Sequence, residues 1–292
     1  MMNILAATDL SAASRPAIER ACRLAGELGA RLHLTHAIAP GLFDDIQRLL
    51  APGTPPIAVT LGNDATKTLH GIADELQRAS GIRADSQVAF GKPVDALLDH
   101  ADEIAADLLV VGSRGESLLR QLTLGSTALS LLRKTRRPIL VVRHPVADGY
   151  RRALVAMDFS AAALAALRQT RTIAPAAELT LAHAVEIPFE RKMHYAGVDG
   201  SVIERYRHEA RIKAMQRLRQ LVDDEKLPEA ATHLLALDGA AADVLLEQAQ
   251  VQDCDLIAVG KRGAHIVEEL LLGSTTRHVL LETGKDVLVA SD

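Results

Sequence analysis

Short apolar runs alternate along the chain with segments in which apolar residues recur every three or four positions. A strand buried on both faces is apolar throughout, whereas a helix that covers a sheet is apolar along one side, so the runs predict strands and the stripes predict helices. In the first half, the predicted strands lie at 2–8, 31–38, 84–89, 107–111 and 138–142. The predicted helices lie at 14–28, 64–80, 93–105 and 126–135. This alternation predicts a parallel sheet with helices on both faces.

A glycine pattern occurs twice along the chain. Residues 112–127 read GSRGESLLRQLTLGST and residues 260–275 read GKRGAHIVEELLLGST, so the motif G-x-x-G-x9-G-S-T recurs after 148 residues (260 − 112). Segment 90–112 matches 238–260 at the same offset. A repeat of this length indicates a duplicated domain.

The duplication sets the expected architecture. We expect one domain at 1–146 and a second at 150–292, each long enough to bury a core of its own. Right-handed crossovers make a doubly wound, Rossmann-like α/β sheet of five parallel strands the simplest arrangement for each copy. Two segments that differ between the copies, 40–56 and 188–201, look loop-like and follow the second strand of their copy.

The composition is that of a globular protein with an aliphatic core, because 48% of the residues are hydrophobic, 24% are charged and tryptophan is absent. A net charge of −4 gives no argument for a nucleic-acid partner, and no apolar run reaches the length of a membrane span. Cys22 and Cys254 occupy non-matching positions in the two halves, which suggests no disulfide framework. Together with an N-terminus unlike a signal peptide, these features predict a cytoplasmic protein.

Each glycine motif has the form that a backbone needs to close around phosphate. The first glycine ends an apolar run, and the third, Gly125 or Gly273, stands directly before a predicted helix. The first N–H groups of a helix and the positive end of its dipole favour anions, and the following Ser and Thr hydroxyls add donors. The alternative is simple N-capping, in which Ser126 and Ser274 serve their own helices.

Charged residues accompany the glycine motifs. Asp9 and Asp158 end the first strand of each copy, where a carboxylate can accept a hydrogen bond from a ribose hydroxyl or form a turn before the next helix. Arg114 and the pair Lys261–Arg262 lie within the loops, facing either the outer phosphates or the solvent. The chain has no G-x-x-x-x-G-K-[ST] motif and no evident base to orient water, so the sequence favours holding a nucleotide over hydrolysing it.

These motifs make the chain resemble the universal stress protein family in its tandem two-domain form, over essentially all 292 residues. The glycine motif is specific to the ATP-binding branch of that family, which implies binding of ATP or AMP, with or without Mg²⁺, by a stress-response sensor or signalling protein. The resemblance also implies a strand order of 3-2-1-4-5. It further implies pairing across the last strands, either within the chain as an intramolecular pseudo-dimer of the two halves or between chains as a homodimer.

The resemblance assigns a set of nucleotide contacts to each copy. The implied adenosine contacts are Asp9, Ala37, Ile38 and Val111 in the first copy and Asp158, Ala184, Val185 and Val259 in the second. The implied phosphate loops contain Gly112, Gly115, Gly125, Ser126 and Thr127, and Gly260, Gly263, Gly273, Ser274 and Thr275. The chain departs from the family pattern at Ala7 and Ala156, where Pro is frequent, and at Arg114 and Arg262, where His is frequent.

Two other functions remain open from the sequence. A slow ATPase or adenylyl-transferring relative would use the same kind of sheet, and a binding module for a non-nucleotide ligand or protein partner would use the two loop-like segments. His36 and His183 match in the repeat, which favours a structural role over metal ligation. The basic segment 204–219 contains interspersed glutamates and an apolar stripe, which favour a docked helix over a surface for nucleic acid or lipid.

Overall fold

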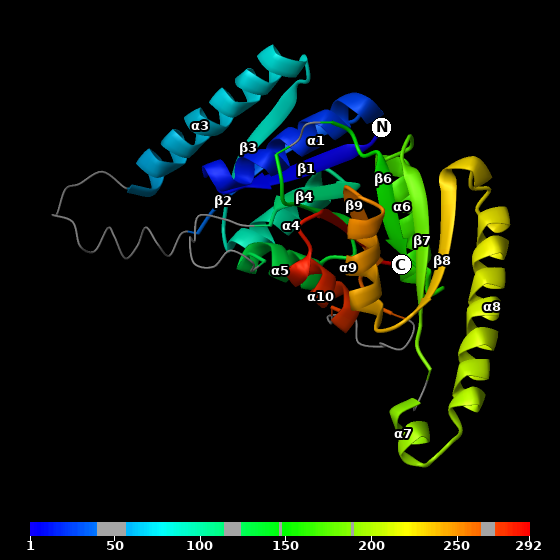
Figure 1. The fold of residues 1–292 in the computed structure, drawn as a ribbon. Helices are drawn as coiled ribbons and strands as arrows, with labels where there is room; N and C mark the ends of the chain where they lie inside the picture. Colours follow the sequence, from blue (N-terminus) through cyan, green and yellow to red (C-terminus); the bar gives the residue numbers. More distant parts are fainter. Residues whose placement is uncertain (40–56, 114–123, 146–147, 188–189, 264–271) are drawn as a thin grey trace. The chain divides into compact units, whose positions relative to one another are not determined.

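The structure is a computed structural model that describes residues 1–39, 57–113, 124–145, 148–187, 190–263 and 272–292 (Figure 1). The chain divides into two compact units, Met1–Gly149 and Tyr150–Asp292. Each unit contains one copy of the sequence repeat.

The first unit is a parallel sheet with strand order β3-β2-β1-β4-β5. Its strands are β1 (Asn3–Thr8), β2 (Arg31–Ile38), β3 (Ala84–Phe90), β4 (Leu108–Gly112) and β5 (Ile139–Val142). Its helices are the short 3-10 turn η1 (Ala12–Ser14) and the α-helices α1 (Arg15–Leu28), α3 (Ile57–Ser80), α4 (Pro93–Glu103) and α5 (Ser126–Lys134). Helix α1 lies along β1 and β4, and α3 lies along β3 (Figure 1).

Helices cover both faces of this first sheet. Ile38 of β2 packs with Ala65 of α3, whereas the preceding residue, Ala37, lines a hollow with Leu97 of α4. Successive side chains of a strand point to opposite faces, so α3 and α4 cover opposite sides of the sheet. This is the doubly wound arrangement predicted from the alternating apolar pattern.

The second unit repeats this topology with strand order β8-β7-β6-β9-β10. Its strands are β6 (Arg152–Ala156), β7 (Glu178–Val185), β8 (Thr232–Asp238), β9 (Leu256–Gly260) and β10 (Asp286–Ala290). Its helices are α6 (Ala161–Ile173), α7 (Glu190–Tyr195), α8 (Gly200–Asp224), the 3-10 turn η2 (Glu229–Ala231), α9 (Ala241–Val251) and α10 (Ser274–Glu282). The five-stranded parallel fold and the order 3-2-1-4-5 are therefore confirmed in both copies.

Two details differ from the sequence prediction. Helix α3 begins at Ile57, seven residues before the predicted start at 64, and runs through Gly62. A Cβ at Gly62 would lie 3.0 Å from the Phe90 ring, so the glycine allows the helix to pass close to that side chain. The segment 188–201, expected to be a loop, contains α7, which Gly197 ends with a φ of 73°. The other loop-like segment, 40–56, lies outside the described residues.

The strands form an aliphatic core. An equivalent hydrogen bond between a backbone N–H and an aspartate carboxylate fixes the start of each copy. Asp107 Oδ2 accepts a hydrogen bond from the Asn3 N–H at 2.8 Å, and Asp255 Oδ1 accepts one from the Arg152 N–H at 3.2 Å. These pairs join the turn before the fourth strand to the first strand of each copy. The central strands are almost completely buried; Leu108 and Leu256 are both 0% exposed.

The end of β9 packs so closely on α6 that it requires glycine. A Cβ at Gly260 would lie 3.0 Å from backbone atoms of Ala162 and Ala163, in the first turn of α6. We expect Gly260→Ala to lower the free energy of unfolding by about 1–3 kcal/mol, because backbone must move to admit the methyl group. Urea unfolding followed by circular dichroism measures the change.

The matched control is Gly71→Ala in the exposed middle of α3. No atom lies within 4 Å of the Cβ position at Gly71, so alanine adds helix propensity without a clash. This variant is expected to gain about 0.5–1 kcal/mol. Equal stability of Gly260→Ala and the parent protein would show that the contact with α6 does not require glycine.

Because the His33 side chain is mostly buried, we expect the stability of the protein to depend on pH. Its side chain is 13% exposed, its Nε2 atom is buried without a hydrogen-bond partner among the described residues, and burial lowers its pKa. The folded state then binds fewer protons than the unfolded state below the ordinary histidine pKa of about 6.5, so stability falls as the pH drops through that value. We expect the loss of unfolding free energy between about pH 7.5 and about pH 5.5 to be smaller in His33→Leu. An unchanged loss would exclude His33 as its source.

Candidate functional site

Each unit has a hollow at the carboxyl ends of its central strands. In the first unit, the hollow has a volume of about 260 Å³ and lies between the ends of β1, β2 and β4 and the starts of α4 and α5. In the second unit, a hollow of about 480 Å³ lies between the ends of β6, β7 and β9 and the starts of α9 and α10. Strand order reverses at β1 and at β6, and ligands of open α/β sheets bind at such points.

Most of the residues predicted from the sequence line these hollows. In the first unit they are Asp9, Ala37, Val111, Gly112, Gly125, Ser126 and Thr127. In the second they are Asp158, Ala184, Val259, Gly260, Arg262, Gly263, Gly273, Ser274 and Thr275. Arg114 and Gly115 lie outside the described residues.

Ile38 and Val185 do not line the hollows. They follow Ala37 and Ala184 on the same strands, so their side chains point to the opposite face of the sheet. Ile38 is 8% exposed and packs with Ala65, while its carbonyl oxygen accepts a hydrogen bond from the Gly91 N–H at 3.0 Å. Sequence reasoning matched the apolar position but not the direction of its side chain.

Sequence reasoning missed the contribution of the helix that follows the third strand. The start of this helix brings Pro93 and Leu97 into the first hollow and Ala241 and Leu245 into the second. These positions match at the same offset of 148 residues as the glycines. The available signal was topological, because this helix starts from the edge at which all parallel strands of the sheet end.

The two aspartates form equivalent turns. Asp9 Oδ1 accepts hydrogen bonds from the N–H of Ser11 at 3.0 Å and from its hydroxyl at 2.6 Å, and Asp158 Oδ1 accepts one from the Ser160 N–H at 2.9 Å. The intervening residues, Leu10 and Phe159, have φ values of 65° and 63°. Bulky residues rarely adopt this left-handed conformation, and such strain concentrates at functional sites. The turn interpretation of both aspartates is therefore confirmed, and it fixes the direction of each carboxylate.

Helices α5 and α10 each follow a glycine N-cap. The N-cap residues are Gly125 and Gly273, and neither helix has a side-chain cap within the described part of the chain. The alternative interpretation, in which Ser126 and Ser274 act as N-caps, is therefore wrong. Helix α6 shows the contrast, since the Oγ atom of its N-cap Ser160 accepts a hydrogen bond from the Ala163 N–H at 3.1 Å.

The uncapped starts of α5 and α10 contribute backbone amides to the hollows. The first hydrogen bonds of these helices run from the Leu129 N–H to the Gly125 carbonyl and from the Arg277 N–H to the Gly273 carbonyl, at 3.0 and 2.9 Å. The three residues before each donor, 126–128 and 274–276, line the hollows. The helix itself provides no carbonyl acceptor for their N–H groups. Their N–H groups and the positive end of the helix dipole form a surface suited to an anion.

The glycine motif brings the chain back to the end of the fourth strand. Gly125 donates its N–H to the Ser113 carbonyl at 2.8 Å, and Gly273 donates to the Lys261 carbonyl at 3.0 Å. A Cβ at Gly263 would lie 3.1 Å from Asp158 Oδ2. The second glycine of the motif therefore permits the loop to lie directly against the aspartate of the neighbouring strand.

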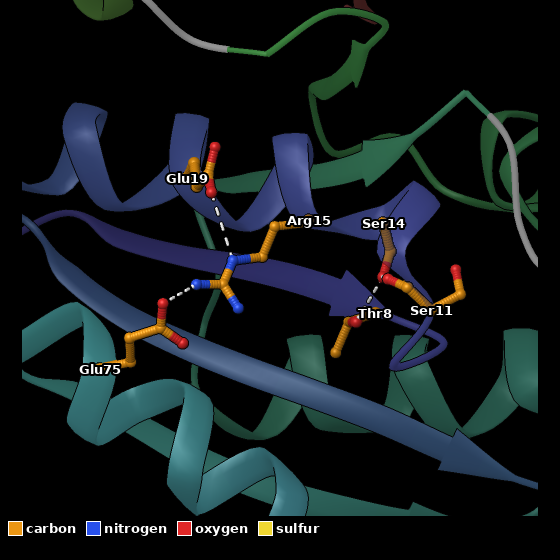
Figure 2. A network of polar contacts seen from close by, with 6 residues as sticks. All are labelled: Thr8, Ser11, Ser14, Arg15, Glu19 and Glu75. Carbon is orange, nitrogen blue, oxygen red and sulfur yellow. Dashed lines mark hydrogen bonds and ion pairs between the residues drawn. The ribbon is translucent and has the colours of Figure 1, made fainter.

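The side chains of Thr8 and Ser14, here called the floor of the first hollow, are polar and bonded to each other (Figure 2). Thr8 Oγ1 and Ser14 Oγ are 2.8 Å apart, and the Ser14 hydroxyl donates a hydrogen bond to the Ser11 carbonyl oxygen at 2.9 Å. Arg15 pairs with Glu19 of α1 and with Glu75 of α3, so it ties the two covering helices together beside this turn. The corresponding residues of the second floor are Met157 and Ala163. The two hollows thus share a backbone frame but differ in the chemistry of their floors.

The matching histidines have a structural role. Nδ1 of His36 lies 2.9 Å from the Thr8 carbonyl oxygen, and Nδ1 of His183 lies 2.6 Å from that of Met157, so each ring ties the second strand of a copy to the end of the first.

In the second hollow, the side chain of Arg262 is 14% exposed, and its guanidinium group lies 3.6 Å from the Asp292 carboxylate. Arg262 therefore belongs to the wall of the hollow.

Within the described ranges, no three histidine, cysteine or carboxylate side chains gather in a way that could hold a metal ion. None of the helices in these ranges combines the length and apolar character that crossing a membrane requires.

Comparisons with known proteins agree with the fold and its duplication. The model of the Universal stress protein family matches residues 1–143 and 149–291. A universal stress protein of Mycolicibacterium smegmatis is 26% identical over 307 aligned positions, which cover 98% of this chain and 96% of that protein. One from Mycobacterium tuberculosis is 32% identical over 146 residues, covering 48% of this chain and 94% of its own length. A crystal structure of a universal stress protein from Archaeoglobus fulgidus shares the fold, with a TM-score of 0.72, 21% identity and coverage of 99% and 98% of the two chains. The chain therefore belongs to the universal stress protein family, and it contains two copies of the family's domain in tandem.

Proposed function

We propose that each unit binds one adenine nucleotide, ATP or AMP, and that the protein acts in a stress response as a sensor or signalling protein through the occupancy of these two sites. The observation that carries the proposal is the glycine-led, uncapped start of α5 and of α10, which lines a hollow opposite an aspartate. Phosphate satisfies the amides, and the aspartate one strand away is within reach of the ribose.

The dimensions of the sheet support this orientation. Adjacent strands lie about 4.8 Å apart, so a ligand that extends from the fourth strand across the first to the second spans about 10 Å. Phosphate would bind at α5 or α10, the ribose at Asp9 or Asp158, and the base beside Ala37 or Ala184. Val111 and Val259 would contact the nucleoside from the fourth strand. Mg²⁺ would accompany the outer phosphates of ATP.

The carboxylates favour a binding role over hydrolysis. Asp9, Asp158 and Glu186 line the hollows, and each accepts a hydrogen bond from a backbone N–H that holds it in a turn or at a helix start. A carboxylate held in this way binds and orients a ligand, whereas rapid hydrolysis also needs a group that orients the attacking water. Slow ATP hydrolysis remains the alternative activity of the same sites. Pairing between the last strands of the two copies, or of two chains, stays a prediction.

Substitutions in the first turn of α5 and of α10 distinguish phosphate binding from a purely structural role of these helix starts. Ser126→Asp and Ser274→Asp each add a negative charge to the first turn, which favours the helix through its dipole but repels a phosphate. We expect each single variant to reduce the number of high-affinity ATP sites from two to one, and both sites of the double variant to lose at least tenfold in affinity. Isothermal titration calorimetry with Mg²⁺ measures both quantities.

Thermal unfolding serves as the control for these variants, because the added carboxylates should leave stability unchanged or slightly raised. ATP affinity within twofold of the parent value in the double variant would exclude phosphate binding at these helices.

The aspartates are expected to recognise ribose hydroxyls. Asp9→Asn and Asp158→Asn retain an oxygen for the turn with Ser11 or Ser160 but remove the charge. A hydrogen bond to a charged group contributes about 1.5–3 kcal/mol, so each variant should weaken ATP binding at its own site by about tenfold or more. Binding of 2′,3′-dideoxy-ATP should change little. If both nucleotides weaken equally, the carboxylate acts only through the turn.

A further inference from the structure

The two hollows differ at the end that lies beyond the second strand. In the second unit, Glu186 directly follows β7 and lines the hollow together with Ala241, the first residue of α9. The corresponding positions in the first unit hold Ala39 and Pro93. A carboxylate is therefore present at this end of one hollow, and alanine stands at the same position in the other.

Glu186 is held in place by the start of α9. Its Oε1 atom accepts a hydrogen bond from the Ala241 N–H at 3.1 Å, and the N-cap residue of this helix, Ala240, has no side chain that can cap it. Proline at position 93 has no N–H group, so the start of α4 offers no equivalent of the Ala241 donor. Helix capping uses one oxygen of this exposed residue, Glu186, and the second is available to a ligand in the hollow.

The position of Glu186 corresponds to the base of the nucleotide in the proposed orientation. The start of α10 follows β9, and β6 lies between β9 and β7 in the sheet. A phosphate at α10 and a ribose at Asp158 leave the end of β7 for the base. A carboxylate oxygen is an acceptor only, so it pairs with an amino group and repels a carbonyl oxygen.

We propose that Glu186 makes the second hollow selective for a 6-aminopurine, adenine, over 6-oxopurines, and that the first hollow lacks this selectivity. The inference rests on the proposed nucleotide binding and extends it to the choice of base. The amino group at C6 of adenine donates to Glu186, whereas hypoxanthine and guanine present an oxygen at that position. The two sites of one chain thus respond to different nucleotide pools.

The test compares ATP with ITP, which differ at the 6-position, in full-length protein with one site blocked. In the Ser126→Asp background, where only the second site binds, ATP is expected to bind at least tenfold more tightly than ITP. In the Ser274→Asp background, where only the first site binds, the two affinities should agree within threefold. Isothermal titration calorimetry gives the dissociation constants.

Glu186→Gln in the Ser126→Asp background is the decisive variant. The glutamine oxygen can still accept from the Ala241 N–H, while its amide nitrogen presents a donor where the carboxylate presented an acceptor. The preference should fall by at least tenfold and turn towards ITP, with an unchanged melting temperature. A Glu186 that only capped α9 would leave the ratio of the two affinities unaltered.

The outcomes separate this inference from the proposed function. If ATP binds neither background at millimolar concentration, nucleotide binding itself fails, and the selectivity of Glu186 fails with it. If ATP binds the second site but Glu186→Gln leaves the ATP-to-ITP ratio unchanged, the role of Glu186 alone is overturned. Tighter binding of GTP than of ATP at the second site would also overturn it.

Discussion

The close approach of β9 to the first turn of α6 is the constraint on which the site of the second unit depends. The absence of a side chain at Gly260 lets the strand end lie against the backbone of Ala162 and Ala163. The loop after the strand then reaches Asp158 at Gly263 and returns to Lys261 at Gly273. Gly260, Gly263 and Gly273 thus act at three different contacts, and only Gly273 stands at the start of a helix, α10. Their shared role is to bring backbone, rather than side chains, to the edge of the hollow.

The helices differ in whether a side chain caps the backbone N–H groups of their first turn. Side chains cap α6 through Ser160 and α8 through Asp199, and Glu186 bonds to the first amide of α9. Helices α5 and α10 follow a glycine N-cap and have no such partner among the described residues. Glycine at the N-cap in place of Ser, Thr, Asp or Asn costs only about a few tenths of a kcal/mol, so the open starts of α5 and α10 are inexpensive to keep. The starts of α5 and α10 lie at the hollows, so their open ends fit the proposed phosphate binding, although α1 and α4 also start without a side-chain cap.

The fold followed from the sequence because its signals are local and occur twice. Continuous apolar runs, one-sided helices and a repeat of 148 residues (260 − 112) determined the strands, the order of elements and the duplication. The motif also brought most of the site residues together, since strand ends and helix starts meet at one edge of a parallel sheet. The direction of Ile38, the early start of α3 and the position of Glu186 were not predicted. Each depends on a contact between distant segments: with Ala65, with Phe90 and with Ala241.

The duplication provides an internal comparison between two versions of one site. The two units share the turn closed by the aspartate carboxylate, with a left-handed residue after it, and the glycine N-cap of the helix at the hollow. The features that differ are side chains, with Thr8 and Ser14 replaced by Met157 and Ala163, and Ala39 replaced by Glu186. Backbone amides bind phosphate with little regard to the rest of a ligand, whereas base selectivity requires individual side chains. The repeat therefore preserves the part of the site that would bind any nucleotide and varies the part that would choose among them.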